Sequence, residues 1–374
     1  MKTIRYILFI SLFIGSFSLF SLGENGSVFA SRTPTKVIVD TDGGVDDAAA
    51  LAWLLVQNRY PAEVLGISTV AGNTSVENAT NNVLTILDVA NLQDVDVVIG
   101  AAAPRVQTLS HSGALVHGPD GLWFSSIPHD QSGLPTDVPT YFRDQALANP
   151  GAKLVTLGPL TNVAAAIEQY PSEMSLFSEI IVMGGSKTLK TPRGDFNIWQ
   201  DTEASAIVLN SGLPITLMTV EASEELTIDQ DDVSDLAYSS EPVAQLLASP
   251  LQFYLGVNNT GTSEMVAPLY DVAAVMYAVN PRFERNSEWA LVKVVQEEGL
   301  AFGQTIIGSN FSEVIPMIID DAQVSALADQ AFTDPNFDLE TELFLIFSSE
   351  PFNANTILRI KDNSMERWFM KSLD

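Results

Sequence analysis

Short apolar runs alternate with amphipathic stretches over most of the chain. The apolar runs, each of strand length, are residues 36–40, 63–70, 95–99, 153–157, 179–183 and 214–219. Stretches of helical composition lie at residues 48–57, 77–89, 160–168 and 202–210. Apolar strands separated by helices predict a sheet covered by helices on both faces. We therefore expect an α/β fold built on a single open, mostly parallel sheet. Residues 221–265 give a less clear pattern that favours helical elaboration.

The first thirty residues have the pattern of an export signal rather than of a folded element. Two basic residues precede an apolar run at residues 6–22, and small residues around Ala30 supply a cleavage site. We predict that residues 1–30 are removed, leaving residues 31–374 as one domain that is periplasmic or secreted. An uncleaved anchor is the alternative. No other stretch of 18 apolar residues occurs, so no stable membrane anchor is expected after cleavage.

The amino-acid composition argues against several kinds of partner and of active site. The 374 residues include 18 Lys and Arg against 46 Asp and Glu, which gives a net charge of −28. This charge argues against nucleic acid as a partner, because phosphate binding needs a basic surface. The absence of cysteine excludes disulfides, thiolate catalysis and iron–sulfur clusters. The three histidines are too few to favour a histidine-rich metal site.

Four carboxylates lie within eight residues, between Asp40 and Asp47. Asp40 and Asp42 face the same side of an extended segment. Asp46 and Asp47 open the next predicted helix, where exposed N–H groups favour negative charge. Mutual repulsion among the four demands a cation, and hard oxygen donors favour Ca²⁺ or Mg²⁺. A solvated acidic turn is the alternative.

Rival motifs do not fit this segment. An EF-hand loop beginning at Asp40 needs glycine at its sixth position and glutamate at its twelfth, where Val45 and Leu51 stand. Gly44 disfavours a phosphoaspartyl hydrolase, which needs threonine or valine at that position. No Walker A, GxGxxG, GxSxG or HExxH string occurs in the sequence.

Further short motifs follow the acidic segment in order. They are Ala71-Gly72-Asn73, Gly100-Ala101 with Pro104, His117-Gly118-Pro119-Asp120-Gly121-Leu122, Leu157-Gly158-Pro159-Leu160-Thr161-Asn162, Met183-Gly184-Gly185, Asp195-Phe196-Asn197, Asp201-Thr202-Glu203-Ala204 and Pro268-Leu269-Tyr270-Asp271. With the acidic segment, they make residues 36–281 resemble the inosine-uridine-preferring nucleoside hydrolase family. The resemblance implies a Rossmann-like nucleoside hydrolase fold, a ribonucleoside substrate and a homodimer or homotetramer.

The resemblance also implies roles for individual residues. The residues that would bind one Ca²⁺ are Asp42, Asp47, Asp271 and Leu157, the last through its backbone carbonyl. The calcium would position a water for attack, with Asp42 as the general base. The residues that would hold the ribose are Asp46, Asn73, Asp195 and Asn197, while Asp40 would orient the other acids from behind. Clustered carboxylates suit an oxocarbenium-like transition state, because they stabilise its positive charge.

Three departures from the family pattern bear on the leaving group and the ribose. Tyr270 stands where many members carry a histidine as leaving-group acid, and a phenol is a weak acid at neutral pH. Residues 186–194 lack an evident counterpart of the family's asparagine, and Asp195 is one methylene shorter than the usual glutamate. Some members without the histidine stack the base between aromatic side chains. The candidates for base contacts here are His117, Trp123, Trp199 and Tyr270. Packing is the alternative for the two tryptophans, and a structural role for His117.

We predict an exported, calcium-dependent enzyme that hydrolyses the N-glycosidic bond of ribonucleosides to ribose and free base. One alternative is a non-catalytic nucleoside- or sugar-binding protein of the same fold. Another is a hydrolase of a different N-ribosyl compound, and a third is a purely structural calcium site. Purine versus pyrimidine preference is left open by the sequence.

Overall fold

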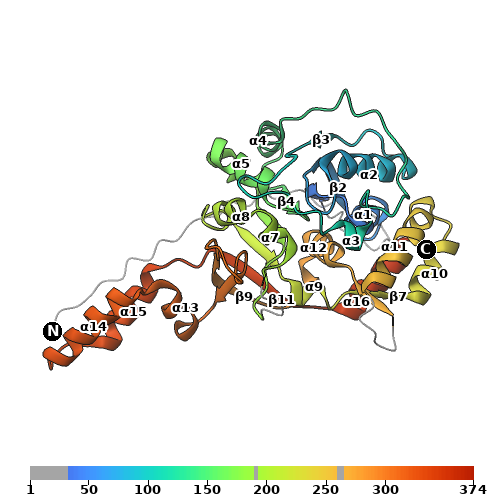
Figure 1. The fold of residues 1–374 in the computed structure, drawn as a ribbon. Coiled ribbons are helices and arrows are strands. Elements are labelled where there is room, and N and C mark those ends of the chain that lie inside the picture. Colours follow the sequence, from blue (N-terminus) through green and yellow to red (C-terminus); the bar gives the residue numbers. More distant parts are fainter. Residues whose placement is uncertain (1–32, 189–192, 259–264) are drawn as a thin grey trace, which may run out of the picture. The chain divides into compact units, whose positions relative to one another are not determined.

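The central sheet has nine strands among the residues that the computed structural model describes, which are 33–188, 193–258 and 265–374 (Figure 1). In spatial order they are β10 (Thr305–Gly308), β9 (Glu284–Val294), β11 (Ala354–Ile360), β6 (Ile215–Met218), β5 (Glu179–Met183), β4 (Lys153–Thr156), β1 (Thr35–Thr41), β2 (Ala62–Thr69) and β3 (Val97–Ile99). The strands from β11 to β3 in this order run parallel to one another, whereas β9 pairs antiparallel with β10 and β11. The expectation of an open, mostly parallel sheet is confirmed.

The six predicted strands are all present, but β9, β10 and β11 were not predicted. Only one stretch of β9, from Ala290 to Val292, is buried on consecutive residues, and the first half of the strand is partly exposed. A strand of that kind gives no continuous apolar run, so the pattern did not reveal it. The predicted export signal, residues 1–30, lies outside the described residues.

Helices cover the sheet on two sides and form two hydrophobic cores. The first core includes residues of α1 (Val45–Val56), α2 (Val76–Val89), α10 (Gln230–Tyr238), α11 (Pro242–Asn258), α12 (Tyr270–Val279) and α16 (Asp362–Ser372). The second includes residues of α4 (Val138–Ala148), α5 (Thr161–Gln169), α6 (Pro171–Met174) and α8 (Thr202–Leu209). Strand β1 contributes side chains to both cores, because Val37 and Val39 belong to the first core and Ile38 belongs to the second. This alternation is why its sequence is apolar on consecutive residues.

Residues 221–265, for which the sequence favoured helical elaboration, contain α10 and α11. They also contain β7 (Thr227–Asp229), which pairs antiparallel with β8 (Val266–Pro268) in a separate two-stranded ribbon. The short helix α9 (Val220–Ser223) follows β6 directly. These elements bring α9 and the start of α12 close to the carboxyl ends of the central strands.

The remaining elements lie in connections. They are α3 (Ala114–His117), α7 (Phe196–Gln200), η1 (Pro281–Phe283), α13 (Phe311–Ile318), α14 (Asp321–Thr333) and α15 (Leu339–Ser349). Neither α14 nor α15 has a buried residue, although α15 carries exposed Phe344 and Leu345. In the described part of the chain, no helix has both the length and the apolar character needed to cross a bilayer.

Candidate active site

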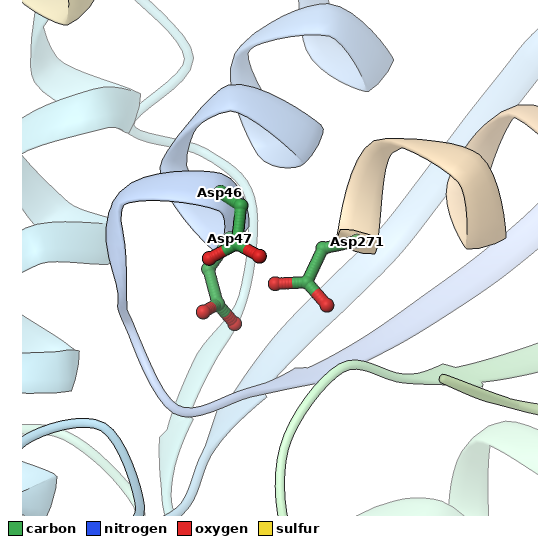
Figure 2. A group of neighbouring side chains, drawn as sticks. All are labelled: Asp46, Asp47 and Asp271. Atoms are coloured by element: carbon green, nitrogen blue, oxygen red, sulfur yellow. The ribbon is translucent and has the colours of Figure 1, made fainter. Parts of the chain in front are cut away.

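Three buried carboxylates converge where two helices begin. Asp46 and Asp47 lie in the first turn of α1, and Asp271 lies in the first turn of α12. One oxygen of each lies within 4.8 Å of the others, and Figure 2 shows the three side chains directed toward a common space. Two sequence segments more than 200 residues apart therefore build one acidic cluster.

Asp47 is the most thoroughly hydrogen-bonded of these acids. Its Oδ1 accepts hydrogen bonds from the Thr41 hydroxyl and, at 3.2 Å, from the backbone N–H of Asp42. Its Oδ2 accepts from the Gly44 N–H at 2.8 Å and from Asn73 Nδ2 at 3.2 Å. Donors from the end of β1, from the β1–α1 connection and from the β2–α2 connection thus fix this carboxylate in position.

Asp42 lies beside Asp47, and both oxygens of its side chain accept hydrogen bonds from Asn73. The backbone N–H of Asn73 donates to Asp42 Oδ2 at 2.8 Å, and Asn73 Nδ2 donates to Oδ1 at 3.0 Å. Glycines leave room for it: a Cβ on Gly72 would lie 2.0 Å from Asp42 Oδ2, and one on Gly158 would lie 2.8 Å from Asp42 Cβ. Burial and the neighbouring Asp47 charge raise the pKa of Asp42 well above its ordinary value.

Asp40 lies behind the cluster, inside the sheet. Its Oδ1 accepts hydrogen bonds from Ser68 Oγ at 2.6 Å and from Asn162 Nδ2 at 2.8 Å. Its Oδ2 is buried without a hydrogen-bond partner among the described residues. Burial raises the pKa of Asp40 to about 7, although the two hydrogen bonds oppose the shift.

His117 lies near the cluster but does not neutralise it. Its Nδ1 accepts a hydrogen bond from the Val45 N–H at 3.0 Å and lies 3.6 Å from Asp46 Oδ1. Burial lowers the pKa of His117 to about 4, so the ring is neutral at pH 7. Burial and the Asp47 charge raise the pKa of Asp46 to about 8, and its Oδ1 has no hydrogen-bond partner in the described chain.

These observations fit a divalent cation. Asp46, Asp47 and Asp271 offer three convergent carboxylates, one with an unpartnered oxygen, and no described salt bridge brings a lysine or arginine to them. An all-oxygen donor set suits Ca²⁺ or Mg²⁺. Among the carboxylates, we expected Asp42 as a metal ligand and Asp46 as a ribose contact. The cluster contains Asp46 in place of Asp42.

A cavity of about 540 Å³ opens onto this cluster. The residues predicted for the site that line it are Asp46, Asn73, His117, Leu157, Asp195, Asn197, Tyr270 and Asp271. Asp40, Asp42 and Asp47 lie behind these residues and do not belong to the described lining. Of the acidic cluster, Asp46 and Asp271 therefore line the cavity, and one oxygen of Asp47 lies within 4.8 Å of both.

Two predicted site residues bind each other. Asn197 Nδ2 donates to the Leu157 carbonyl oxygen at 2.6 Å and to the Met183 carbonyl at 3.2 Å. Asp195 caps α7 by accepting from the Ile198 N–H at 3.2 Å, and its other oxygen accepts from the Gly185 N–H at 2.8 Å. Burial raises the pKa of Asp195 to about 6 against these hydrogen bonds.

The two tryptophans proposed as base contacts do not lie on the described cavity wall. Trp123 stacks on Phe253 of α11, with ring centroids 5.0 Å apart. Trp199 packs against Phe196 and lies beneath the guanidinium of Arg193. Both rings pack against neighbouring side chains, and the expected base contact stays a prediction.

Other aromatic residues line the cavity instead. They are Phe196, Tyr254 and Tyr270. Tyr254 lies in the stretch whose pattern is unclear, and Phe196 lies between the polar residues Asp195 and Asn197, so neither was predicted from the sequence. Burial, followed by the charge of Glu224, raises the pKa of Tyr270 above its ordinary value, so its phenol stays protonated at neutral pH.

Comparison with known proteins adds independent information. A family model described as inosine-uridine preferring nucleoside hydrolase matches residues 37–343. Uridine nucleosidase 1 of Arabidopsis thaliana is 29% identical over 289 residues, covering 76% of this chain and 84% of that protein. The non-specific ribonucleoside hydrolase RihC of Salmonella newport is 32% identical over 249 residues, covering 66% and 78%. The solved structure of a plant nucleoside hydrolase, the PpNRh1 enzyme, matches with a TM-score of 0.74 at 23% identity, covering 91% of this chain and 99% of that one.

Proposed function

The chain belongs to the inosine-uridine preferring nucleoside hydrolase family and is a ribonucleoside hydrolase, and from this premise we propose a calcium-dependent mechanism with defined residue roles. The observation that carries the proposal is the buried carboxylate cluster of Asp46, Asp47 and Asp271 at a cavity of about 540 Å³. A cavity of this size suits a nucleoside.

In the proposed reaction, Asp42 is the general base. It takes a proton from the attacking water while the water oxygen bonds to C1′ of the ribose. The C1′–N bond breaks, and its electron pair leaves with the nucleobase. The two hydrogen bonds from Asn73, at 2.8 and 3.0 Å, hold both Asp42 oxygens and fix the direction of proton transfer.

The remaining acids act on charge and orientation. As C1′–N cleavage proceeds, the ribose becomes cationic, and carboxylates stabilise this state more than the neutral substrate. Asp47, Asp271, Asp42 and the Leu157 carbonyl are the proposed ligands of one Ca²⁺, with Asp46 beside them. When bound, the cation supplies positive charge that keeps these acids ionised and draws ribose hydroxyls to the cluster.

Ribose recognition is proposed for the residues that meet the cavity next to the cluster. They are Asp46, Asn73, Asp195 and Asn197. Asn197 is fixed by its bonds to two backbone carbonyls, and Asp195 by its cap of α7. Such fixed groups reduce the entropy lost when the substrate is oriented.

At the leaving-group end, Tyr270 and His117 line the cavity with Tyr254. Tyr270 is proposed to donate a hydrogen bond to the departing base rather than a full proton, since burial holds its phenol protonated. This role suits nucleobases that leave with little protonation.

We also propose that the protein is exported after removal of residues 1–30, which the N-terminal pattern supports. We propose further that it assembles into a homodimer or homotetramer, which the resemblance to the family supports.

Ribose release by purified residues 31–374 tests the proposal. Inosine, adenosine, guanosine, uridine and cytidine are each assayed with added calcium and with chelator. We expect release that chelator abolishes and calcium restores. Release that is equal with chelator would contradict the calcium dependence. Tight binding of intact nucleosides without release would instead favour a binding protein.

A further inference from the structure

The connection from β10 to β11 carries two helices that the rest of the protein does not cover. We call residues 320–350, which hold α14, α15 and the turn between them, the arm (Figure 1). Neither helix has a buried residue. On the arm, Phe332 is 89% exposed, Phe344 58% and Leu345 56%. Large apolar side chains left in water on consecutive helices indicate a surface that another molecule covers.

The inner face of α15 packs against its own chain. Leu343, Ile346 and Phe347 are half-buried, and their spacing places them on one side of the helix. The Phe347 ring lies against Phe311 of α13, with centroids 5.6 Å apart, and against Phe352, at 6.0 Å. This side of α15 therefore has its partners in α13 and in the segment that leads to β11.

The outer face of α15 has a second stripe, which consists of Thr341, Phe344, Leu345 and Ser348. All four side chains are exposed, and their spacing of i, i+3, i+4 and i+7 places them on one side of the helix. None of the four is charged, although the arm contains eight Asp and Glu residues and no Lys or Arg. The outer stripe is therefore an uncharged surface, apolar at its centre, on an acidic arm.

The charge of the arm decides between possible occupants. An acidic arm is repelled by anionic lipid and by nucleic acid, and helices that lie on membranes are rich in Lys and Arg. A basic protein would be attracted by acids on the face that it covers, but the outer stripe has none. An uncharged stripe beside acids fits a partner that presents the same kind of stripe.

The outer stripe is complementary to itself when two copies of α15 run antiparallel. A two-fold axis between Phe344 and Leu345 brings the Phe344 of each copy to the Leu345 of the other. The same axis brings the Thr341 of each copy to the Ser348 of the other. Large apolar side chains then meet at the centre, and small hydroxyl side chains at both ends let the helices approach.

This register also keeps the acids of α15 apart. Glu340 of one copy lies at the level of Ser349 of the other, and Glu342 lies at the level of Phe347. In a parallel pair, each glutamate would instead lie beside its own counterpart, and like charges at such positions are destabilising. The antiparallel pair is therefore the arrangement that the sequence of α15 favours.

We propose that the outer stripe of α15 binds the outer stripe of a second copy of this chain, antiparallel, in an interface with two-fold symmetry. The inference assigns a surface to the homodimer or homotetramer proposed above; it rests on that assembly and not on nucleoside hydrolysis. A specific dimer buries about 800 Å² on each copy. At about 200 Å² per phenylalanine, Phe332 and Phe344 offer roughly 300 Å² of apolar area for its centre.

Disulfide trapping tests the register, because the chain has no cysteine of its own. Copies with Thr341→Cys are mixed with copies with Ser348→Cys and oxidised with Cu(II)-phenanthroline. We expect a linked dimer in the mixture and at least tenfold less in either variant alone, since a disulfide needs Cα atoms within about 7 Å. Replacing Ser348→Cys by Ser349→Cys, one position off the stripe, is the matched control and should abolish the link.

A charge placed on the stripe tests its part in assembly. Phe344→Glu should weaken self-association at least tenfold in sedimentation velocity, because it places two like charges at the centre of the interface. Ala326→Glu adds the same charge at an exposed position of α14 and should leave self-association unchanged. Both variants should keep the melting temperature, which shows that the fold is intact.

Ionic strength separates a second copy from an oppositely charged partner surface. Sodium chloride at 0.5 M should tighten self-association relative to 0.1 M, since it screens the acids of the two arms from each other. Weaker association at high salt would overturn the inference, because it would indicate contact between opposite charges.

The remaining outcomes distinguish this inference from the proposals on which it rests. Self-association that persists in Phe344→Glu, with no link in the mixture, would overturn the stripe and leave the proposed assembly on another surface. A protein that stays monomeric at all concentrations would overturn both. A protein that forms the link but releases no ribose would support the stripe and contradict the proposed calcium-dependent hydrolysis.

Discussion

Asp42, whose two oxygens accept hydrogen bonds from Asn73, is the proposed general base. Replacing it tests the proposed mechanism most directly. We expect Asp42→Asn to lower kcat about a thousandfold, in the range that general-base catalysis contributes. Asparagine is nearly isosteric, so the fold should be kept. Steady-state ribose release and a melting curve measure the two effects.

The control for Asp42 is Asp94→Asn, which alters an exposed acid outside the described site. It should leave both kcat and the melting temperature unchanged. If Asp42→Asn keeps kcat within tenfold of the unaltered enzyme, Asp42 is not the base. The general base would then be one of the other acids of the cluster.

Asp40 predicts a pH dependence of stability at the residue scale. Burial raises its pKa from 3.8 in the unfolded reference to about 7, so between these values the folded state holds a proton that the unfolded chain has released. Stability without metal should therefore fall as pH rises from about 4 to 7. At pH 8 the loss from Asp40 is up to about 4 kcal/mol.

Denaturant unfolding in chelator at pH 5 and pH 8 checks this loss. Asp40→Asn keeps an oxygen that can accept from Ser68 and Asn162, and it removes the titrating group. Its stability should decline less over the same pH interval. A decline as steep as that of the unaltered protein would assign the pH dependence to other acids.

At the scale of elements, the connections after β2 and β4 leave just enough space for Asp42. A Cβ on Gly72 would lie 2.0 Å from Asp42 Oδ2, so Gly72→Ala must displace either the loop or the carboxylate. We expect kcat/KM to fall about a hundredfold, as for a displacement of about 1 Å in a catalytic group. Kinetics on the best nucleoside measure this.

Gly133→Ala is the matched control for Gly72, because no atom lies within 4 Å of a Cβ built there. It should change the free energy of unfolding by less than about 0.5 kcal/mol and leave kcat/KM unchanged. Normal activity in Gly72→Ala would show that the loop yields without moving Asp42. The close approach would then have no catalytic meaning.

At the scale of the whole molecule, the net charge of −28 and the buried acids should make stability depend on divalent cations. Chelator should lower the melting temperature, and calcium should raise it again. At a hundredfold excess over Kd, one bound ion adds about 2.7 kcal/mol. Calorimetry at constant ionic strength separates this effect from general screening by salt.

Asp271→Asn is the variant that localises the cation effect. It alters one acid of the cluster that lies on α12, far in sequence from the others. The increment caused by calcium should be largely lost in this variant. If the increment persists in full, the cation binds elsewhere on the acidic surface.

The sequence by itself determined the features that depend on local order. Six strands, four helices and the mostly parallel sheet followed from apolar runs, since strands buried on both faces are apolar on consecutive residues. The segment from Asp40 to Asp47 and the ordered motifs also identified the family. Half-exposed β9 was missed because partial burial leaves no such run.

Only the tertiary structure decided which distant side chains meet. It brought Asp271 to Asp46 and Asp47, placed Trp123 on Phe253, and joined Glu221 to Ser186. Such contacts depend on how helices and strands pack, and on where each hydroxyl proton is directed. Neither is encoded within a few residues of sequence, because each requires two segments far apart in the chain to be fixed against one another.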